Sequence, residues 1–598
     1  MAHWLAGAAI VGTAMGLGTA LILLAGLLVV GRPRWASLPV VFVLLATGWL
    51  FDRSVAGLQP PPDGPMEGWV TLTADPTEFG GTGVRVKARW GRARVSLVAY
   101  GTVSRALTDR LSGEQLKISG SFRGGNHTEW ARWQHDVGVI SLTALHDTQP
   151  GSPLTRFTNQ VRRWLSRGAE SLPDHDRATF LGMVIGDDRD QSAVIADDFR
   201  STGLGHLLVV SGQNVAFLLA VLEPVLIRSR PAVRIVAVAG ALLCFAVLTR
   251  FEPSVLRAVG MAGVSVGAAT IGLPVDSRKA LSLALAGALL VDPFLIRSVA
   301  FQLSVAATAG IVWLAGPLAA RIPGPSTFRV ALATTVAAQV AVAPLLQFRF
   351  GSVPLFSLPA NLLAGPVSGL IMMWGCTGGL LAGICGGVVA DVLHWPTRLM
   401  VGWVRWVARL GPTVPPFLLS DLGVVSAGIG VLGLVSSQRS LRRLGAVLAG
   451  VAMLTSLMAP ASVGPGVHRL ATSTVVVGAD GITVIVSSQA RDRTVVEELR
   501  LAGLTDLHTV VVQSGSRRAG EVVVALRERF GELLVVAPPH HQVPTARTLA
   551  VGQRLTLSHG SIAVDATTTP PQLRWEPSAL AETVDVSAPG AKVNGDDR

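Results

Sequence analysis

Residues 205–215 read GHLLVVSGQNV and place a Ser-Gly pair and two amides inside an apolar run that extends from residue 204 to residue 227. A helix that faces lipid has no use for Gly212 followed by Gln213 and Asn214, because an uncompensated polar group in hydrocarbon is costly. The stretch therefore predicts a break in the helix and a functional site within a membrane domain.

The composition around this stretch is that of a membrane protein. Hydrophobic residues make up 50% and charged residues 15% of the 598 residues, and the mean hydropathy is +0.50. Polar residues are concentrated at 52–203 and after 465. We therefore predict six parts: a transmembrane hairpin (1–52), a small β domain (53–150), amphipathic helices (151–203), a membrane core (204–460), an α/β domain (466–573) and a disordered tail (574–598).

Apolar runs long enough to cross a bilayer predict a polytopic α-helical protein with about 10–12 spans. They lie at 5–30, 35–51, 204–227, 235–249, 255–272, 279–296, 299–319, 328–346, 357–384, 387–410, 422–436 and 444–460. Several are short or Gly-rich, which also fits re-entrant or interfacial segments, and Trp403, Arg405, Trp406 and Arg409 form an interfacial pattern. Arginine and lysine in the short loops fall on one side when the spans alternate, which puts both soluble parts outside the cytoplasm.

The three cysteines all lie in apolar segments. They are Cys244, Cys376 and Cys385, so neither soluble part can hold a disulfide or a thiolate metal site. We expect them to be small buried hydrophobic residues.

The first soluble part, from about residue 68 to residue 147, alternates apolar and polar residues between turn signals. This pattern predicts a small β-barrel or sandwich, of which an OB-like barrel is one form. Basic residues share one strand face near an aromatic residue, an arrangement that tracks and stacks a single nucleic-acid strand. The alternative is a solvated outer strand face. The DNA-binding candidates are Arg85, Lys87, Arg89, Trp90, Arg92 and Arg94.

Residues 154–171 and 176–185 have a helical period. Arg156, Arg162, Arg163 and Arg167 fall on the polar side of the first helix. We expect these helices to lie on the membrane surface or against the core helices; the alternative is that their arginines guide a polyanion.

Four segments of the membrane core interrupt its apolar pattern with small or polar residues: GLGHLLVVSGQNV (203–215), EPSVLRAVGMAG (252–263), residues 278–311 and APLLQFRFGSVPLFSLPANLLAGPVSGLIM (343–372). With these segments the core resembles the ComEC family of bacterial competence channels, and the first is similar to the family's Ser-Gly signature. These segments occur in the family's order, and the hairpin and β insert before them and the polar part after them also match. Many relatives have His after the Ser-Gly pair, where this chain has Gln213, so a proton or metal role there is weakened.

The resemblance implies a channel that passes one strand of transforming DNA into the cytoplasm, and polar residues at the motifs are its candidates. These are His206, Ser211, Gly212, Gln213, Asn214, Arg257, Asp292, Gln302, Ser304 and Asn361. The alternatives are an ion pair or a snorkelling side chain for Arg257 and Asp292, and helix packing through small residues for Ser211 and Gly212. The four prolines of 343–372 predict a broken helix or a plain loop around Asn361.

The second soluble part, 472–565, alternates strands and helices, which predicts a layered α/β domain. In the family this place is often taken by a metallo-β-lactamase-like domain, whose chemistry needs His and Asp ligands for two metals. Where that ligand motif should follow LHTVVV, this chain has QSGSRRA (513–519). His540, His541 and His559 are scattered and read as surface residues. We predict no metal, no cofactor and no hydrolase activity.

The leading functional hypothesis is an inner-membrane channel for single-stranded DNA, in contact with membrane lipid. The chain has no GxxxxGK[ST] loop, so a cytoplasmic motor or single-strand-binding proteins must drive import, with a DNA receptor outside. The resemblance leaves room for a homo-oligomer. Two alternatives remain: a membrane-tethered hydrolase or nuclease with an unrecognised C-terminal site, and a transporter of another polyanion.

Overall fold

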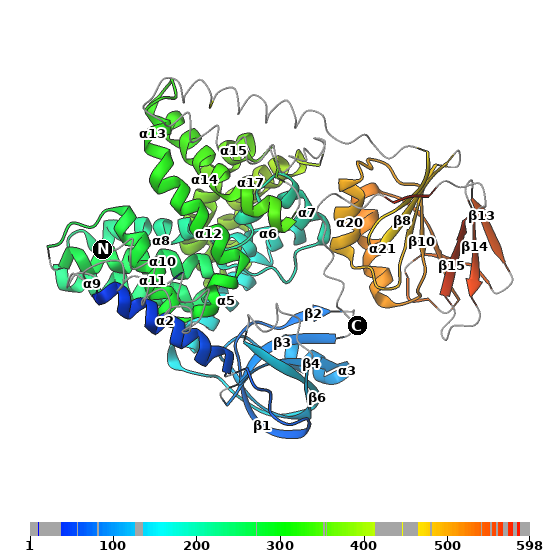
Figure 1. The fold of residues 1–598 in the computed structure, drawn as a ribbon, viewed down its shortest axis with the longest axis horizontal. Helices are drawn as coiled ribbons and strands as arrows, with labels where there is room; N and C mark the ends of the chain where they lie inside the picture. Colours follow the sequence, from blue (N-terminus) through cyan, green and yellow to red (C-terminus); the bar gives the residue numbers. More distant parts are fainter. Residues whose placement is uncertain are drawn as a thin grey trace, which may run out of the picture.

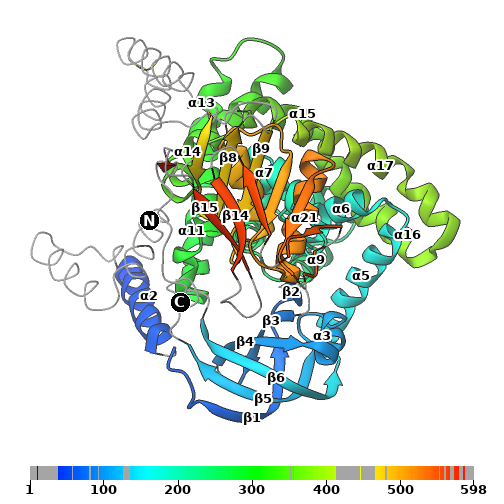
Figure 2. The same cartoon turned by 90° about the vertical axis from the view of Figure 1, so that its right-hand side faces the viewer.

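The structure is a computed structural model. It describes residues 10, 38–56, 58–79, 83–91, 93–125, 135–270, 272–350, 353–354, 356–412, 445, 465–478, 481–539, 541–543, 545–550, 553–557, 560–565, 572–577 and 583–585. The predicted spans 5–30, 422–436 and 444–460 lie outside the described residues apart from residues 10 and 445, as do Arg92, His540 and His559. Figures 1 and 2 show the helical core with a β domain below it and a second soluble domain beside it.

The first soluble part is a small closed β-barrel. Its strands are β1 (Gly64–Leu72), β2 (Thr77–Phe79), β3 (Gly83–Trp90), β4 (Ala93–Tyr100), β5 (Gln115–Gly124) and β6 (Asp136–Gln149), with α3 (Gly101–Thr108) between β4 and β5. The strand order is β1-β5-β6-β4-β3-β2, and β1 also pairs with β3, which closes the barrel. Alternate residues such as Val84, Val86 and Ala88 fill its interior.

Three helices follow the barrel: α5 (Pro153–Ala169), α6 (Asp174–Ile185) and α7 (Ala193–Ser201). The amphipathic prediction is wrong for α6, because it is buried on nearly every side. Ser152 and Ser192 cap α5 and α7 by accepting hydrogen bonds from the amides of Thr155 and Ile195. The prediction for Arg162 is wrong, because its side chain does not lie on an exposed polar side of α5 but is 3% exposed. Its buried partners come from distant segments of the chain.

Helices and short helical turns make up the described part of the membrane core. They are α2 (Leu38–Ala56), η2 (Gly205–Leu207), α8 (Gly212–Leu226), α9 (Pro231–Leu248), α10 (Pro253–Thr270), α11 (Ser277–Val291), η3 (Pro293–Arg297), α12 (Val299–Gly310), the π-helix η4 (Ile311–Ala315), α13 (Gly316–Ala319), α14 (Ser326–Phe350), α15 (Ser357–Trp374), the π-helix η5 (Gly375–Gly379), α16 (Leu380–Cys385) and α17 (Gly387–Arg409).

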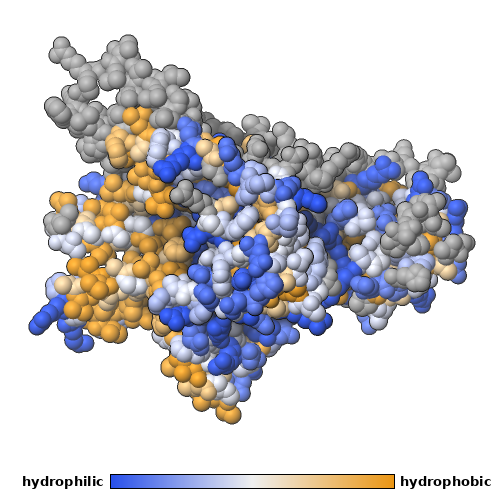
Figure 3. All heavy atoms as spheres, turned by 90° about the horizontal axis from the view of Figure 1, so that it is seen from below, coloured by the Kyte–Doolittle hydropathy of each residue, from blue (hydrophilic) through white to orange (hydrophobic). Residues whose placement is uncertain are grey.

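Four of the described helical segments are long and apolar enough to cross a membrane: Pro231–Leu248, Val299–Ala319, Ser326–Phe350 and Ser357–Cys385. Figure 3 shows apolar residues gathered over the side of the molecule that carries α9, α10 and α11 in Figure 1, while hydrophilic residues cover the opposite side. The protein is therefore a membrane protein.

Two predictions about the core helices need correction. Residues 357–374 form one continuous helix, α15, with Pro366 inside it, so the region around Asn361 is neither a broken helix nor a loop. Helix α17 has the length of a span but is amphipathic: Val401, Val404 and Val407 are buried, whereas Trp395 and Trp406 are 65% and 51% exposed. Its pattern fits the interfacial alternative.

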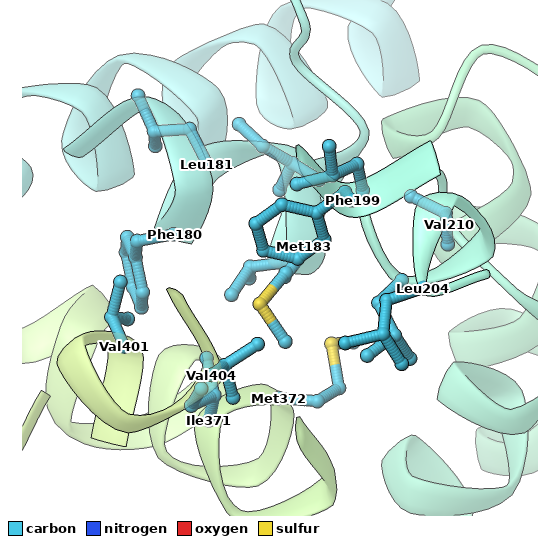
Figure 4. Close-up of a cluster of buried hydrophobic side chains, with 14 of the residues drawn as sticks. Phe180, Leu181, Met183, Phe199, Leu204, Val210, Ile371, Met372, Val401 and Val404 are labelled. Carbon is cyan, nitrogen blue, oxygen red and sulfur yellow. The ribbon is translucent and has the colours of Figure 1, made fainter. Parts of the chain in front are cut away.

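The packed centre of the core lies where α6, α7, α15 and α17 meet (Figure 4). Phe180 and Met183 of α6 and Phe199 of α7 contribute buried side chains from one side. Met372 of α15 and Val404 of α17 contribute them from the other. This cluster supports α6, whose last turn contacts the Ser-Gly motif.

The second soluble part, here called the tail domain, is a layered α/β domain. Its elements are β7 (Gly466–Arg469), β8 (Ser473–Gly478), β9 (Gly481–Val486), α20 (Asp492–Leu501), β10 (Thr509–Val512), α21 (Arg517–Phe530), β11 (Leu534–Ala537), β12 (Arg547–Thr548), β13 (Arg554–Leu557), β14 (Gly560–Asp565), β15 (Gln572–Pro577) and β16 (Thr583–Asp585).

Seven strands of the tail domain form one sheet in the order β12-β11-β10-β9-β8-β7-β16, and β13, β14 and β15 form a second sheet. Helices α20 and α21 pack on one face of the larger sheet and the smaller sheet packs on the other. The predicted layering is present. The disordered tail predicted from residue 574 is wrong in part, because β15 extends to Pro577 and β16 pairs with β7.

Candidate functional site

The Ser-Gly motif breaks the helix as the sequence predicts. The short turn η2 ends at Leu207, and α8 begins only at Gly212, with Ser211 as its N-cap. The Ser211 hydroxyl accepts a hydrogen bond from the amide of Gln213 at 3.2 Å. Asn214 is buried and its side-chain amide donates to the carbonyl of Met183 in α6 at 3.0 Å. Ser211 and Asn214 therefore build the break, and Asn214 fixes it to α6.

Arg257 of α10 lies against the N-terminal end of α8. Its Nε donates to the Ser304 hydroxyl of α12 at 2.9 Å, and a Cβ placed on Gly212 would lie 2.4 Å from its Nη2. Gly212 is therefore the residue that lets the guanidinium approach the helix end. Within the described part of the chain, no carboxylate forms an ion pair with Arg257. A cation at the positive end of a helix without a counter-charge is a place where an anion binds favourably.

A small pocket opens beside this helix end. Gln213 is exposed, and no described residue bonds its side-chain amide. His206 is also exposed, and its Nδ1 lies 3.1 Å from the carbonyl oxygen of Gly203. The pocket is lined by Met183, Leu207, Val209, Ser211, Gln213, Asn214 and Ser368. The Gln213 amide and the Arg257 guanidinium thus lie at the same end of α8, although Arg257 does not line the pocket.

Three predicted site residues lie elsewhere. Asp292 caps η3 and lies 3.1 Å from His135 of the barrel, so it belongs to the seam between barrel and core. Gln302 donates to the carbonyl of Ile296 at 2.7 Å. Asn361 donates to the carbonyl of Ser357, one turn earlier in α15. The sequence predicted an ion pair as an alternative for Asp292, and the structure places its partner in the barrel.

The predicted basic residues of β3 and β4 share one outer face of the barrel, as the alternation predicts. On β3 the side chains of Arg85 and Arg89 are exposed and Lys87 is half-buried. On the neighbouring strand β4, Arg94 is exposed and pairs in register with Arg89. Burial lowers the pKa of Lys87, against the attraction of Asp136. Four cationic side chains therefore share the outer face of β3 and β4.

Trp90, the aromatic residue predicted to lie beside the basic stripe, is not on the outer face of these cations. Trp90 lies on the inner side of β3 with its ring centroid 5.8 Å from that of Phe122, because the period of two places it with the core residues. The outer face instead carries Phe79 and Tyr100, whose ring centroids are 5.8 Å apart, and Tyr100 is 59% exposed. The Arg85 guanidinium lies 5.0 Å from the centroid of the Phe79 ring. The pairing of β2 with β3 and of β3 with β4 brings the Phe79 and Tyr100 rings together, and we call this pair the aromatic platform. Tyr100 is the one tyrosine of the chain.

The tail domain has a polar loop after β10, where the resemblance expects metal ligands. Ser516 caps α21, and the amide of Gln542 donates to the carbonyl of Gly515 at 2.9 Å. The His541 ring bonds the Thr548 hydroxyl at 3.1 Å. No group of three or more His, Cys, Asp or Glu residues that could hold a metal ion occurs in the described ranges.

Comparison with known proteins shows what the membrane core is similar to. Residues 183–439 match the family model described as "Competence protein". The chain is 24% identical over 306 residues to "ComE operon protein 3" of Bacillus subtilis (strain 168), an alignment that covers 49% of this chain and 39% of the relative. No solved structure matches the chain. The matched region contains the Ser-Gly motif, Arg257 and Ser304, and through it the chain is similar to the ComEC family of competence proteins.

Proposed function

We propose that this protein is a channel that passes single-stranded DNA across the cytoplasmic membrane during natural competence. The observation that carries the proposal is Arg257, a cation at the N-terminal end of α8 for which the described residues supply no carboxylate partner. A guanidinium without a counter-ion among membrane helices raises the free energy of the folded protein unless an anion binds it. The phosphates of a DNA strand are such anions.

The outer face of the barrel supports the same substrate. Arg85, Arg89 and Arg94 supply positive charge along two adjacent strands, and Phe79 and Tyr100 supply rings on which bases can stack. Basic grooves with exposed aromatics bind single strands with little sequence preference. The closed pairing, the parallel β4–β6 contact and the helix α3 before β5 favour an OB-like barrel, a form that often binds oligonucleotides.

We infer that both soluble domains lie outside the cytoplasm, where the barrel receives a strand before it enters the core. The positions of the basic loops support this orientation. A receptor would then deliver DNA from outside, and a cytoplasmic motor or single-strand-binding proteins would draw it in. The tail domain is proposed to be a metallo-β-lactamase-like domain that does not hydrolyse DNA, because QSGSRR (513–518) offers no metal ligand at the loop after β10.

The test is DNA entry in a strain that lacks this gene. Labelled DNA is scored in a nuclease-protected cytoplasmic pool, and surface-bound DNA is scored beside it. The proposal predicts that the protected pool and transformants both vanish while surface-bound DNA persists. Normal entry without the gene would contradict it and would favour another polyanion as the transported substrate.

A further inference from the structure

A buried cluster of charged residues lies where the barrel meets the membrane core. Its members, here called the junction cluster, are Asp75, Arg162, Asp187, Arg189 and Arg250. They come from the β1–β2 connection of the barrel, from α5, from the α6–α7 connection and from the α9–α10 connection. The cluster therefore joins four segments that are distant in the sequence.

Asp75 is the barrel's contribution to the cluster. Its carboxylate forms an ion pair with Arg162 at 2.9 Å. It accepts hydrogen bonds from Arg250 at 2.8 Å and from the amide of Ser112. Burial acts to raise the pKa of Asp75, but Arg162, Arg250 and the Ser112 amide outweigh it and hold the pKa below its usual value. Asp75 is thus an ionised side chain enclosed between two arginines of the core.

Arg162 connects Asp75 to the Ser-Gly motif. Its Nη1 donates to the carbonyl of Ile185 at 2.9 Å, in the last turn of α6. In that same turn the carbonyl of Met183 accepts the hydrogen bond of Asn214, the buried amide of the motif. The last turn of α6 is therefore held by the junction cluster on one side and by the motif on the other.

A second route leads from the cluster to Arg257. The Nη1 of Arg162 also donates to the carbonyl of Leu248 at 3.0 Å, at the end of α9. Arg250 follows in a left-handed conformation (φ 58°), and α10, which carries Arg257, begins at Pro253. Arg250, which binds Asp75, thus lies in the short connection directly before α10.

We propose that Asp75 and Arg162 are positioning residues that hold the barrel in one orientation on the core, so that its basic face leads to the motif and Arg257. A buried ion pair with further hydrogen bonds suits this task, because removal of one partner leaves an uncompensated charge and the directions of the hydrogen bonds favour one geometry. The inference rests on the proposed function, since it assigns the barrel and the core to one DNA path.

The test compares Asp75→Asn with two controls. Asp75→Glu keeps the negative charge. Glu67→Gln removes a different barrel carboxylate, which is 61% exposed and forms an ion pair with Lys117 at 3.5 Å. Three quantities are measured. They are the entry of labelled DNA, the affinity of purified full-length protein for a single-stranded oligonucleotide, and the distribution of distances between a spin label on the barrel and one on the core, by pulsed electron paramagnetic resonance. The spin labels are placed at Ser121 and Val236 in a variant without the native cysteines.

We expect Asp75→Asn to reduce DNA entry about tenfold or more while oligonucleotide affinity stays within about twofold, and to broaden the distance distribution. Asp75→Glu should restore most of the entry, and Glu67→Gln should behave like the unsubstituted protein. If Asp75→Asn does not accumulate in the membrane, Arg250→Gln takes its place, because Arg162 still holds Asp75 in that variant.

Normal entry in the charge-removing variants, or lost entry with an unchanged distance distribution, would overturn the positioning role. Failure of the proposed function has a different result: the unsubstituted protein would not bind the oligonucleotide, and the deletion strain would import DNA normally. The two failures are therefore distinguishable.

Discussion

The barrel and the tail domain both rest on the membrane core, but their interfaces differ. The barrel is fixed by the junction cluster, in which Arg162 and Asp75 are almost fully buried. The tail domain is fixed mainly through α7: Arg500 pairs with Asp197 at 2.8 Å, Arg529 with Asp198 at 2.5 Å, and Arg200 with Glu497 at 3.0 Å. The contacts of the barrel continue to the Ser-Gly motif and to the start of α10, whereas those of the tail domain are made mostly with α7. Under the proposed function, this difference assigns the barrel to the DNA path and makes the tail domain an attached support.

The largest expected effect is on the barrel's basic face. Reversing three charges (Arg85→Glu, Arg89→Glu and Arg94→Glu) should lower affinity for a single-stranded oligonucleotide about a hundredfold, because each phosphate contact adds to a salt-dependent attraction. The dependence of affinity on salt should become shallower. Fluorescence anisotropy at several salt concentrations measures both.

The matched control reverses three charges on other faces of the barrel: Arg105→Glu, Lys117→Glu and Arg123→Glu. Its affinity should fall much less. Equal losses in the two triple variants would mean that net charge, not the face of β3 and β4, attracts the strand.

A smaller effect is expected at the aromatic platform. Tyr100→Ala should reduce oligonucleotide affinity by about 1–3 kcal/mol, the usual contribution of one base stacked on an aromatic ring. Trp69→Ala, which removes an exposed aromatic residue from β1, is the control. If both variants lose affinity to the same extent, or if neither variant loses affinity, Tyr100 does not stack a base.

The attachment of the tail domain should depend weakly on pH through Asp198. Burial raises the pKa of Asp198 to about 6, although Arg529 acts to lower it; Asp197 and Arg409 also act on it. Because the docked form binds this proton more tightly than an undocked form with an ordinary pKa, docking should strengthen as the pH falls through about 6. Above that range Asp198 is ionised in both forms and its contribution is constant.

Pulsed electron paramagnetic resonance at about pH 7.5 and about pH 5, with spin labels at Arg547 and Val236, measures how docking of the tail domain depends on pH. The distance distribution should narrow at the lower pH, and Asp198→Asn should remove the change. A distribution that broadens on acidification would show instead that the Arg529 ion pair outweighs the cost of burying Asp198.

The smallest effect is expected in the loop after β10. Arg517→Ala with Arg518→Ala should leave DNA hydrolysis unchanged, because the tail domain is proposed to have none with magnesium, manganese or zinc. Incubation of purified protein with labelled strands measures this. Metal-dependent cleavage by the unsubstituted protein would support the hydrolase alternative. The tail domain would then be an enzyme rather than an attached support.

Local patterns predicted the parts of the molecule that local forces build. The Ser-Gly break, the common face of Arg85, Lys87 and Arg89, and the layers of the tail domain follow from helix breaking and from the two periods of strands and helices. The same period of two places Trp90 with the core residues of the barrel and not with the basic side chains.

Residues joined by long-range contacts could not be predicted from local patterns. Tyr100 meets Phe79 only because β2, β3 and β4 pair side by side. Arg162 has the period of a solvated face, and it is buried only because Asp75 and Asp187 arrive from distant segments. Asn361 looked like a break in a helix, yet it bonds within its own helix.

The central claim is that a DNA strand passes Arg257, and one substitution tests it most directly. Entry of labelled DNA into the nuclease-protected pool is measured for Arg257→Gln and for Arg257→Lys, with membrane levels matched. The account predicts that Arg257→Gln abolishes entry while surface-bound DNA persists, and that Arg257→Lys retains part of it because the positive charge remains. Entry at the unsubstituted level in Arg257→Gln would contradict the account.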